Sequence, residues 1–131
     1  MKMSATIKSS LNRHEVSVET NDVVKTVQIP GKATGYGSSV NGGELLLLSL
    51  ATCFCNDIYR EAAKRNIVSN VEVEFTGQFG GEGEPGFNFQ YNAKVVADAT
   101  QEEINALIEH TDRVAEIHNT LRNGLKITLA K

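Results

Sequence analysis

Residues 44–55 read ELLLLSLATCFC, and the chain continues as NDIYREAAKRN through residues 56–66. Asn41 is a favourable N-cap for a helix over this stretch, and Glu44 stands three residues later, where a capping-box partner belongs. These signals predict one long helix from Asn41 to about Arg65. A helix of this length and polarity decides the fold, because the rest of the chain must cover it.

The two halves of this helix differ in polarity. Residues 44–55 are apolar on every side, whereas residues 56–66 are amphipathic and emerge to solvent. A helix that is apolar all round is covered by a core or an oligomer interface, because a surface helix carries only an apolar stripe. The apolar run has about half the length that crosses a bilayer, so we expect no membrane partner.

Strand-like alternation precedes the helix. Apolar and polar residues alternate over residues 5–11 and 16–18, and a third strand-like segment covers residues 23–29. An Asn-Asp pair at 21–22 fits a hairpin turn between the second and third segments. Residues 32–43, KATGYGSSVNGG, have neither a strand period nor a helix period, so we expect a surface loop there.

Further strands and helices follow. Residues 71–79 and 87–95 alternate as a hairpin with a long glycine-rich tip. Thr100 opens a full capping box, and the apolar spacing after it predicts two helices that stop at the Asn-Gly pair at 123–124. Residues 125–129 alternate again, so we expect a last strand there.

The length and charge of the chain limit its class. A chain of 131 residues fits one domain. We therefore predict a single α+β domain over residues 1–131 with the order βββ-α-ββ-αα-β, in which antiparallel sheets surround a long buried central helix. The net charge is −3 and the basic residues are scattered, which argues against nucleic acid or an anionic membrane as the partner.

The N-terminal sequence bears on localisation. Residues 1–10, MKMSATIKSS, contain no apolar stretch after their lysines, and a secretory signal peptide needs one. We therefore expect a cytoplasmic protein, whose thiols are kept reduced. Its two cysteines are then core residues or reactive groups rather than a disulfide framework.

Cys53 and Cys55 lie two residues apart in the predicted helix. Side chains at this spacing point about 200° from each other, so the two thiols cannot share a metal ion. A zinc or iron–sulfur site needs further soft ligands, which the three scattered histidines do not supply. We therefore predict no metal and no cofactor.

The residues alone leave two interpretations of Cys53 open. A cysteine in an apolar helix is usually an inert core residue. A nucleophilic cysteine needs a nearby positive charge to stabilise its thiolate. Asn56, Asp57 and Arg60 share its helix face, and the Asp57–Arg60 pair fits a solvated salt bridge more simply than a catalytic device.

Two separated segments resemble one protein family. Residues 44–53 resemble the start of the central helix of the OsmC family, named for osmotically inducible protein C, whose sister branch is the organic hydroperoxide resistance proteins. Residues 113–124, RVAEIHNTLRNG, resemble the family's second signature. Element order, the glycine-rich loop and chain length also match. The resemblance implies an intertwined homodimer, in which two central helices lie between sheets and the cysteine pocket lies at the subunit boundary.

The resemblance also implies a chemistry. In the family's peroxidases a cysteine, here Cys53, attacks a hydroperoxide and becomes a sulfenic acid, which a second cysteine resolves. Arg13 stands about where the family places the arginine that holds the thiolate, and Glu44 matches a glutamate of the broader pattern. Gly43 stands in place of the peroxidase glutamate, and Ala115 in place of the resolving cysteine.

These departures shape the functional hypotheses. Cys55 faces away from Cys53, so the sulfenate would need an external thiol, or Cys55 of the partner subunit. His118 in the second signature is a candidate base, although a histidine beside apolar helix positions is more often packed. The leading hypothesis is thiol-dependent reduction of organic hydroperoxides. The alternatives are a non-catalytic dimer that binds a small apolar ligand and a redox sensor without turnover.

Overall fold

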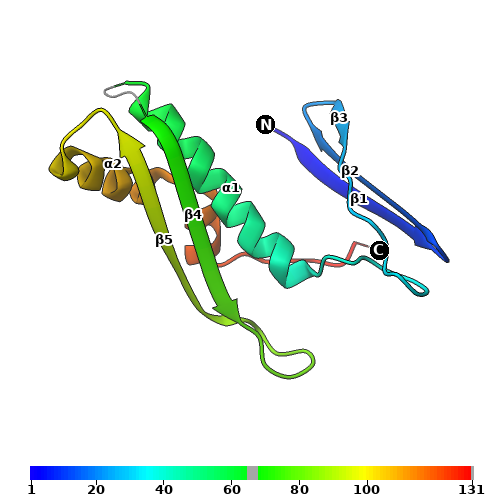
Figure 1. Cartoon of the computed structure of the whole chain (residues 1–131). Coiled ribbons are helices and arrows are strands. Elements are labelled where there is room, and N and C mark those ends of the chain that lie inside the picture. Colours follow the sequence, from blue (N-terminus) through cyan, green and yellow to red (C-terminus); the bar gives the residue numbers. More distant parts are fainter. Residues whose placement is uncertain (65–67, 131) are drawn as a thin grey trace. The chain divides into compact units, whose positions relative to one another are not determined.

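The computed structural model describes residues 1–64 and 68–130, and it divides into two compact units (Figure 1). The first unit is Met1–Leu45, and the second is Leu46–Lys131. The first contains a three-stranded sheet, and the second contains a two-stranded sheet with helices. The α+β class with antiparallel sheets is confirmed, while the assignment of the whole chain to a single domain stays a prediction.

The first unit is a three-stranded antiparallel meander. Its strands are β1 (Met3–Ser10), β2 (Arg13–Thr20) and β3 (Val23–Thr26), paired in the order β1-β2-β3. The predicted turn between β2 and β3 is confirmed: Asn21 and Asp22 have φ angles of 47° and 67°. Positive φ at both turn residues matches the right-handed twist of the flanking strands. The third strand is shorter than predicted.

The long helix α1 spans Gly42–Ala62. Its capping box forms as predicted, because the Glu44 backbone N–H donates to Asn41 Oδ1 at 2.8 Å and the Asn41 N–H donates to Glu44 Oε1 at 3.0 Å. The predicted end of the helix at Arg65 lies outside the described residues.

The second unit joins a hairpin to two shorter helices. The hairpin consists of β4 (Val68–Gln78) and β5 (Phe87–Ala97), and the helices are α2 (Gln101–Val114) and α3 (Glu116–Arg122). Ala115 separates the helices because its ψ of 113° is extended. Both predicted helices and the capping box that opens α2 are confirmed.

The core of this unit forms where α1 meets the hairpin and the two later helices (Figure 1). One face of α1 supplies Phe54 and Ile58, neither of which has exposed surface. The ring of Phe54 lies 5.0 Å from that of Tyr91 on β5, in an edge-on arrangement. This face of the helix is fixed by burial, and the orientation of the neighbouring α1 side chains follows from it.

Burial of α1 is uneven along its length. Its buried residues begin at Leu50, which is 5% exposed, whereas Leu48 in the apolar first half is 58% exposed. The all-round cover predicted for residues 44–55 is therefore not complete within one chain.

The strand predicted over residues 125–129 is wrong for this structure. Residues 124–130 belong to no helix or strand among the described residues. Ile127 and Leu129 are 87% and 82% exposed. The alternating pattern is present, but a strand also needs a neighbour for its backbone hydrogen bonds, and the described chain pairs none with this segment.

Candidate functional site

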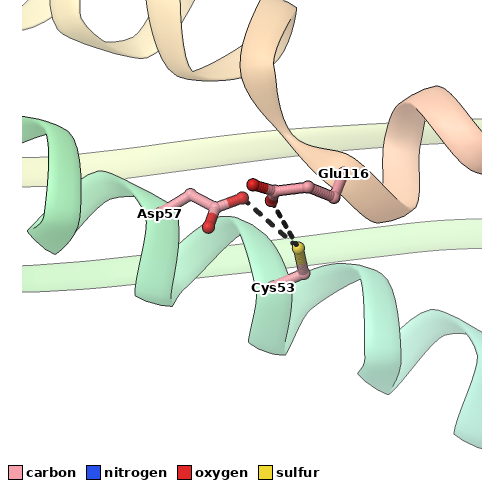
Figure 2. Close-up of side chains that lie close together, drawn as sticks. All are labelled: Cys53, Asp57 and Glu116. Carbon is pink, nitrogen blue, oxygen red and sulfur yellow. Dashed lines mark hydrogen bonds between the residues drawn. The ribbon is translucent and has the colours of Figure 1, made fainter. Parts of the chain in front are cut away.

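The thiol of Cys53 lies where α1 approaches the start of α3 (Figure 2). Cys53 and Asp57 are one helical turn apart on the same face of α1, and the thiol donates to Asp57 Oδ2 at 3.3 Å. Glu116, the first residue of α3, brings its Oε2 to 3.9 Å from the same sulfur. Because Ala115 breaks the helical path just before Glu116, the chain turns this carboxylate toward α1.

Arg60 joins the two carboxylates around the thiol. Its Nη1 lies 3.1 Å from Asp57 Oδ1 and 2.9 Å from Glu116 Oε1, and its Nε lies 3.1 Å from Glu61 Oε2. The predicted Asp57–Arg60 salt bridge is confirmed, but it is only partly solvated, because the Arg60 side chain is 44% exposed whereas Asp57 is only 5% exposed. The packing of α3 against α1 removes this carboxylate from water, and Arg60 compensates its charge.

The surroundings of Cys53 favour the thiol over the thiolate. Burial raises the pKa of Cys53, and the hydrogen bond and charge of Asp57 and the charge of Glu116 raise it further. The backbone of Ile117 acts in the opposite direction. Within its own unit Cys53 is therefore held protonated, and Asp57 accepts the hydrogen bond from its thiol.

The two carboxylates are held differently. Burial raises the pKa of Asp57, and the nearby charge of Glu116 adds to the rise. The pKa of Glu116 is lowered, first by its own backbone N–H and then by the Arg60 guanidinium. A proton shared near the thiol therefore resides on Asp57 in preference to Glu116.

Cys53, Asp57 and Glu116 could also be considered as metal ligands. Their ligand atoms lie within 4.8 Å of one another. However, Arg60 already binds both carboxylates, and its positive charge would oppose a divalent cation at the same place. The arrangement fits a charge-compensated thiol site better than a metal site.

Arg13 and Glu44 belong to the first unit, which is described by itself. The Arg13 side chain is 74% exposed and pairs with Glu15 Oε1 at 2.8 Å. The Glu44 carboxylate caps the first turn of α1. Glu44 therefore has a structural role in the described chain, and Arg13 has a guanidinium that is open to solvent.

Cys55 and His118 lie away from the hydrogen bonds of Cys53. Both cysteines are free and partly buried, so the described chain contains no disulfide between them. His118 is 4% exposed and packs against the rings of Phe54, Phe75 and Tyr91. The expectation that His118 is a packed residue fits this position.

Sequence reasoning singled out Cys53 as a candidate and found only part of the group around it. Asp57 and Arg60 were recognised as sharing its face, and only the packing of α3 shows that Asp57 is buried. Glu116 lies 63 residues away in sequence. The one sequence signal for Glu116 was that it directly follows Ala115. Position 115 is the one that the family resemblance gives to the second cysteine.

The charge around the thiol makes a testable prediction. In a Cys55→Ser background, Asp57→Asn should speed alkylation of Cys53 by iodoacetamide near pH 8 about threefold to tenfold, because loss of the carboxylate charge lowers the thiol pKa. The matched control is Glu61→Gln, which removes a carboxylate that binds Arg60 but does not contact the sulfur. An unchanged or slower rate in Asp57→Asn would show that the carboxylate does not suppress the thiolate.

Comparison with solved structures places the fold. The chain is similar to an OsmC-like protein from Mycoplasma pneumoniae, with 20% identity, a TM-score of 0.63, and coverage of 95% of this chain and 91% of that one. It is also similar to an organic hydroperoxide resistance protein OsmC from Legionella pneumophila, with 19% identity, a TM-score of 0.59, and coverage of 93% and 90%. An OsmC-like hydroperoxide resistance protein from a Jannaschia species gives 16% identity, a TM-score of 0.55, and coverage of 95% and 87%. At these identities the likeness shows the fold.

Sequence comparison gives the family. No curated protein matches the chain. Among the described residues, no helix has the length and apolar character that a membrane crossing requires. The family model for OsmC-like protein matches residues 35–130, which is most of the chain. The chain therefore belongs to the OsmC-like protein family.

Proposed function

We propose that this protein reduces organic hydroperoxides with external thiols as the reductant and Cys53 as the reactive group. Membership of the OsmC-like family supports a redox role. Two proteins of similar fold are named for hydroperoxide resistance. The observation that carries the proposal is the placement of the Cys53 thiol: it is partly exposed, and it donates a hydrogen bond to the carboxylate of Asp57.

The proposed first step is a displacement at oxygen. Cys53 Sγ attacks the distal oxygen of the hydroperoxide, so an S–O bond forms as the O–O bond breaks. The thiol proton passes through Asp57 to the departing alkoxide, which leaves as an alcohol, and Cys53 becomes a sulfenic acid. Two external thiols then restore the Cys53 thiol and leave as a disulfide, with release of one water.

The need for an external thiol rests on Ala115. The family resemblance puts the second cysteine at this position, and the residue that follows it, Glu116, carries a carboxylate 3.9 Å from Cys53 Sγ. Position 115 is therefore the direct neighbour of Glu116, whose carboxylate contacts the Cys53 thiol. With alanine there, no intramolecular disulfide can form, and Cys55 lies on the other side of α1.

The proposal also needs a positive charge, because the second unit alone disfavours the Cys53 thiolate. Arg13 is the residue that the family resemblance offers for this role. Its guanidinium is exposed, and its ion pair with Glu15 joins two side chains of the same strand and is exposed to solvent. Such a pair is weak, so Arg13 is available to bind a thiolate.

A second candidate is a redox sensor that is oxidised without turnover. The alanine at position 115 favours this candidate, because no cysteine stands there to resolve the Cys53 sulfenic acid and start another cycle. The two candidates differ in rate and in recycling, and both depend on the same sulfur.

Turnover separates these candidates. With cumene hydroperoxide and dithiothreitol, the wild-type protein should consume peroxide over many cycles, and Cys53→Ser should lose essentially all of this activity. Cys55→Ser is the matched control and should keep activity within about twofold, because the thiol of Cys55 takes no part in the proposed cycle. Consumption that stops after one equivalent per chain would favour the sensor. Equal loss in both variants would contradict the assignment to Cys53.

A restored second thiol tests the position of the site. In a Cys55→Ser background, Ala115→Cys should convert the oxidised product from a sulfenic acid, which dimedone traps, into an intramolecular disulfide with Cys53. Mass spectrometry after one equivalent of hydroperoxide should show the loss of two hydrogen atoms and no dimedone adduct. The parent with Ala115 should give the adduct. An adduct on Cys53 in both proteins would show that position 115 is out of reach of the sulfur.

We also propose that the protein is a homodimer. Leu48 on α1 is 58% exposed, and the alternating apolar residues Ile127 and Leu129 are 87% and 82% exposed. Apolar surface of this kind is usually covered by a partner, and the family resemblance makes that partner a second copy of this chain.

Sedimentation equilibrium checks the dimer. The wild-type protein should have twice the chain mass, and Leu48→Glu should weaken the association by at least about tenfold, because it introduces a charge into the covered apolar surface. Tyr59→Glu is the matched control: Tyr59 is 43% exposed on the amphipathic half of the same helix and should leave the mass unchanged. A wild-type monomer at micromolar concentration would rule out the dimer.

A further inference from the structure

A cavity of about 390 Å³ lies within the second unit. This volume falls in the range of small-molecule sites, which is roughly 300–1,000 Å³. Its walls are mainly apolar and come from α1, the β4–β5 hairpin and α3. They include Leu46, Leu50, Phe75, Phe89, Leu121 and the imidazole of His118. Cys53 is not among the lining residues, so the cavity is a separate feature from the thiol site.

His118 is the unusual member of this lining. It is 4% exposed, and neither ring nitrogen has a hydrogen-bond partner among the described residues. Buried polar groups in proteins are nearly always paired, and an unpaired one costs about 1–3 kcal/mol. The rings of Phe75 and Tyr91 stand edge-on to the imidazole, at centroid distances of 5.3 and 5.0 Å. An N–H directed at an aromatic face compensates only weakly.

The charged side chain that lines the cavity is already paired. Arg122 also lines the cavity, but its Nη2 binds Asp112 Oδ1 at 2.8 Å and its Nη1 donates to the Asp112 backbone oxygen at 3.1 Å. The hydroxyl of Tyr91 also donates to the Asp112 carboxylate. These polar groups satisfy one another, so they leave no free cation for an anionic ligand.

The imidazole itself is neutral at physiological pH. Burial lowers the pKa of His118, and the charge of Arg122 lowers it further, against the opposing effect of Asp112. A neutral imidazole has one donor nitrogen and one acceptor nitrogen. A hydroxyl group can pair with it in either sense, as donor to one nitrogen or acceptor from the other.

We propose that this cavity binds a neutral, mainly apolar molecule, aromatic or branched aliphatic, whose single hydroxyl group pairs with the unpartnered imidazole of His118. The apolar walls supply affinity through burial, and the imidazole supplies the selection for the hydroxyl. The site uses no atom of Cys53, so it stands whether or not the thiol reduces hydroperoxides.

Two probes of equal shape test the role of the imidazole. In 2-phenyl-2-propanol a hydroxyl replaces one methyl group of tert-butylbenzene, and both molecules fit the cavity volume. Binding is followed through the backbone amide signals of Phe89 and Gln90 and the imidazole ¹⁵N signals of His118. Both probes should shift the amide signals, and only the alcohol should shift the imidazole signals by forming a hydrogen bond.

Variants then measure the hydrogen bond. The ratio of the dissociation constants of the two probes should change about threefold to tenfold between wild type and His118→Phe, because a hydrogen bond to a neutral group has that net value. His118→Leu serves the same purpose if phenylalanine disturbs the neighbouring rings. Leu121→Trp, which fills the cavity from a half-exposed position, should weaken both probes equally and leave their ratio unchanged.

Three results would overturn the proposal. One is the absence of amide shifts with either probe, which would also be seen if a second copy of the chain filled the cavity. Another is a probe ratio that His118→Phe and His118→Leu leave unchanged. The third is an imidazole signal that responds equally to the alcohol and the hydrocarbon. The wild-type imidazole measurement needs no variant, so the proposal can be tested even if both substitutions unfold the protein.

Discussion

The burial of one face of α1 controls the placement of both sites. Phe54 and Ile58 have no exposed surface, because they fill the space between the β4–β5 hairpin and the two later helices. A helix is rigid over this distance, so once these two side chains are seated, their neighbours have no freedom of direction. Cys53 and Asp57 are thereby turned toward the start of α3, while Leu50 is turned into the cavity.

The charges beside Cys53 are opposite in sign to those that usually surround a reactive thiol. Low-pKa cysteines lie beside cations or helix N-termini, whereas Cys53 contacts two carboxylates. Arg60 does not reverse this effect, because its charge is already shared among Asp57, Glu61 and Glu116. The proposed hydroperoxide reduction therefore requires a further positive charge beside Cys53. The proposed role of Arg13 follows from that requirement, since its own ion pair is exposed and weak.

Local interactions were predictable from sequence, and distant ones were not. The capping boxes at Asn41 and Thr100 each involve residues three apart, so the sequence contains all of the information that they need. The strand over residues 125–129 has the right alternation, but a strand depends on a neighbour that its own sequence does not specify. For the same reason the contact of Glu116 with Cys53 was missed, because it depends on how α3 packs against α1.

The short helix α3 explains how two different polar groups can be kept apart in one small unit. Glu116 and His118 are two residues apart, a spacing that turns their side chains about 200° from each other around the helix axis. One side of α3 therefore presents a carboxylate to the thiol, and the other presents a neutral imidazole to an apolar cavity. Because Ala115 is fully buried at the start of this helix, a side chain much larger than that of cysteine would displace α3 and disturb both sites together. A small side chain at position 115 is thus a packing requirement of the unit.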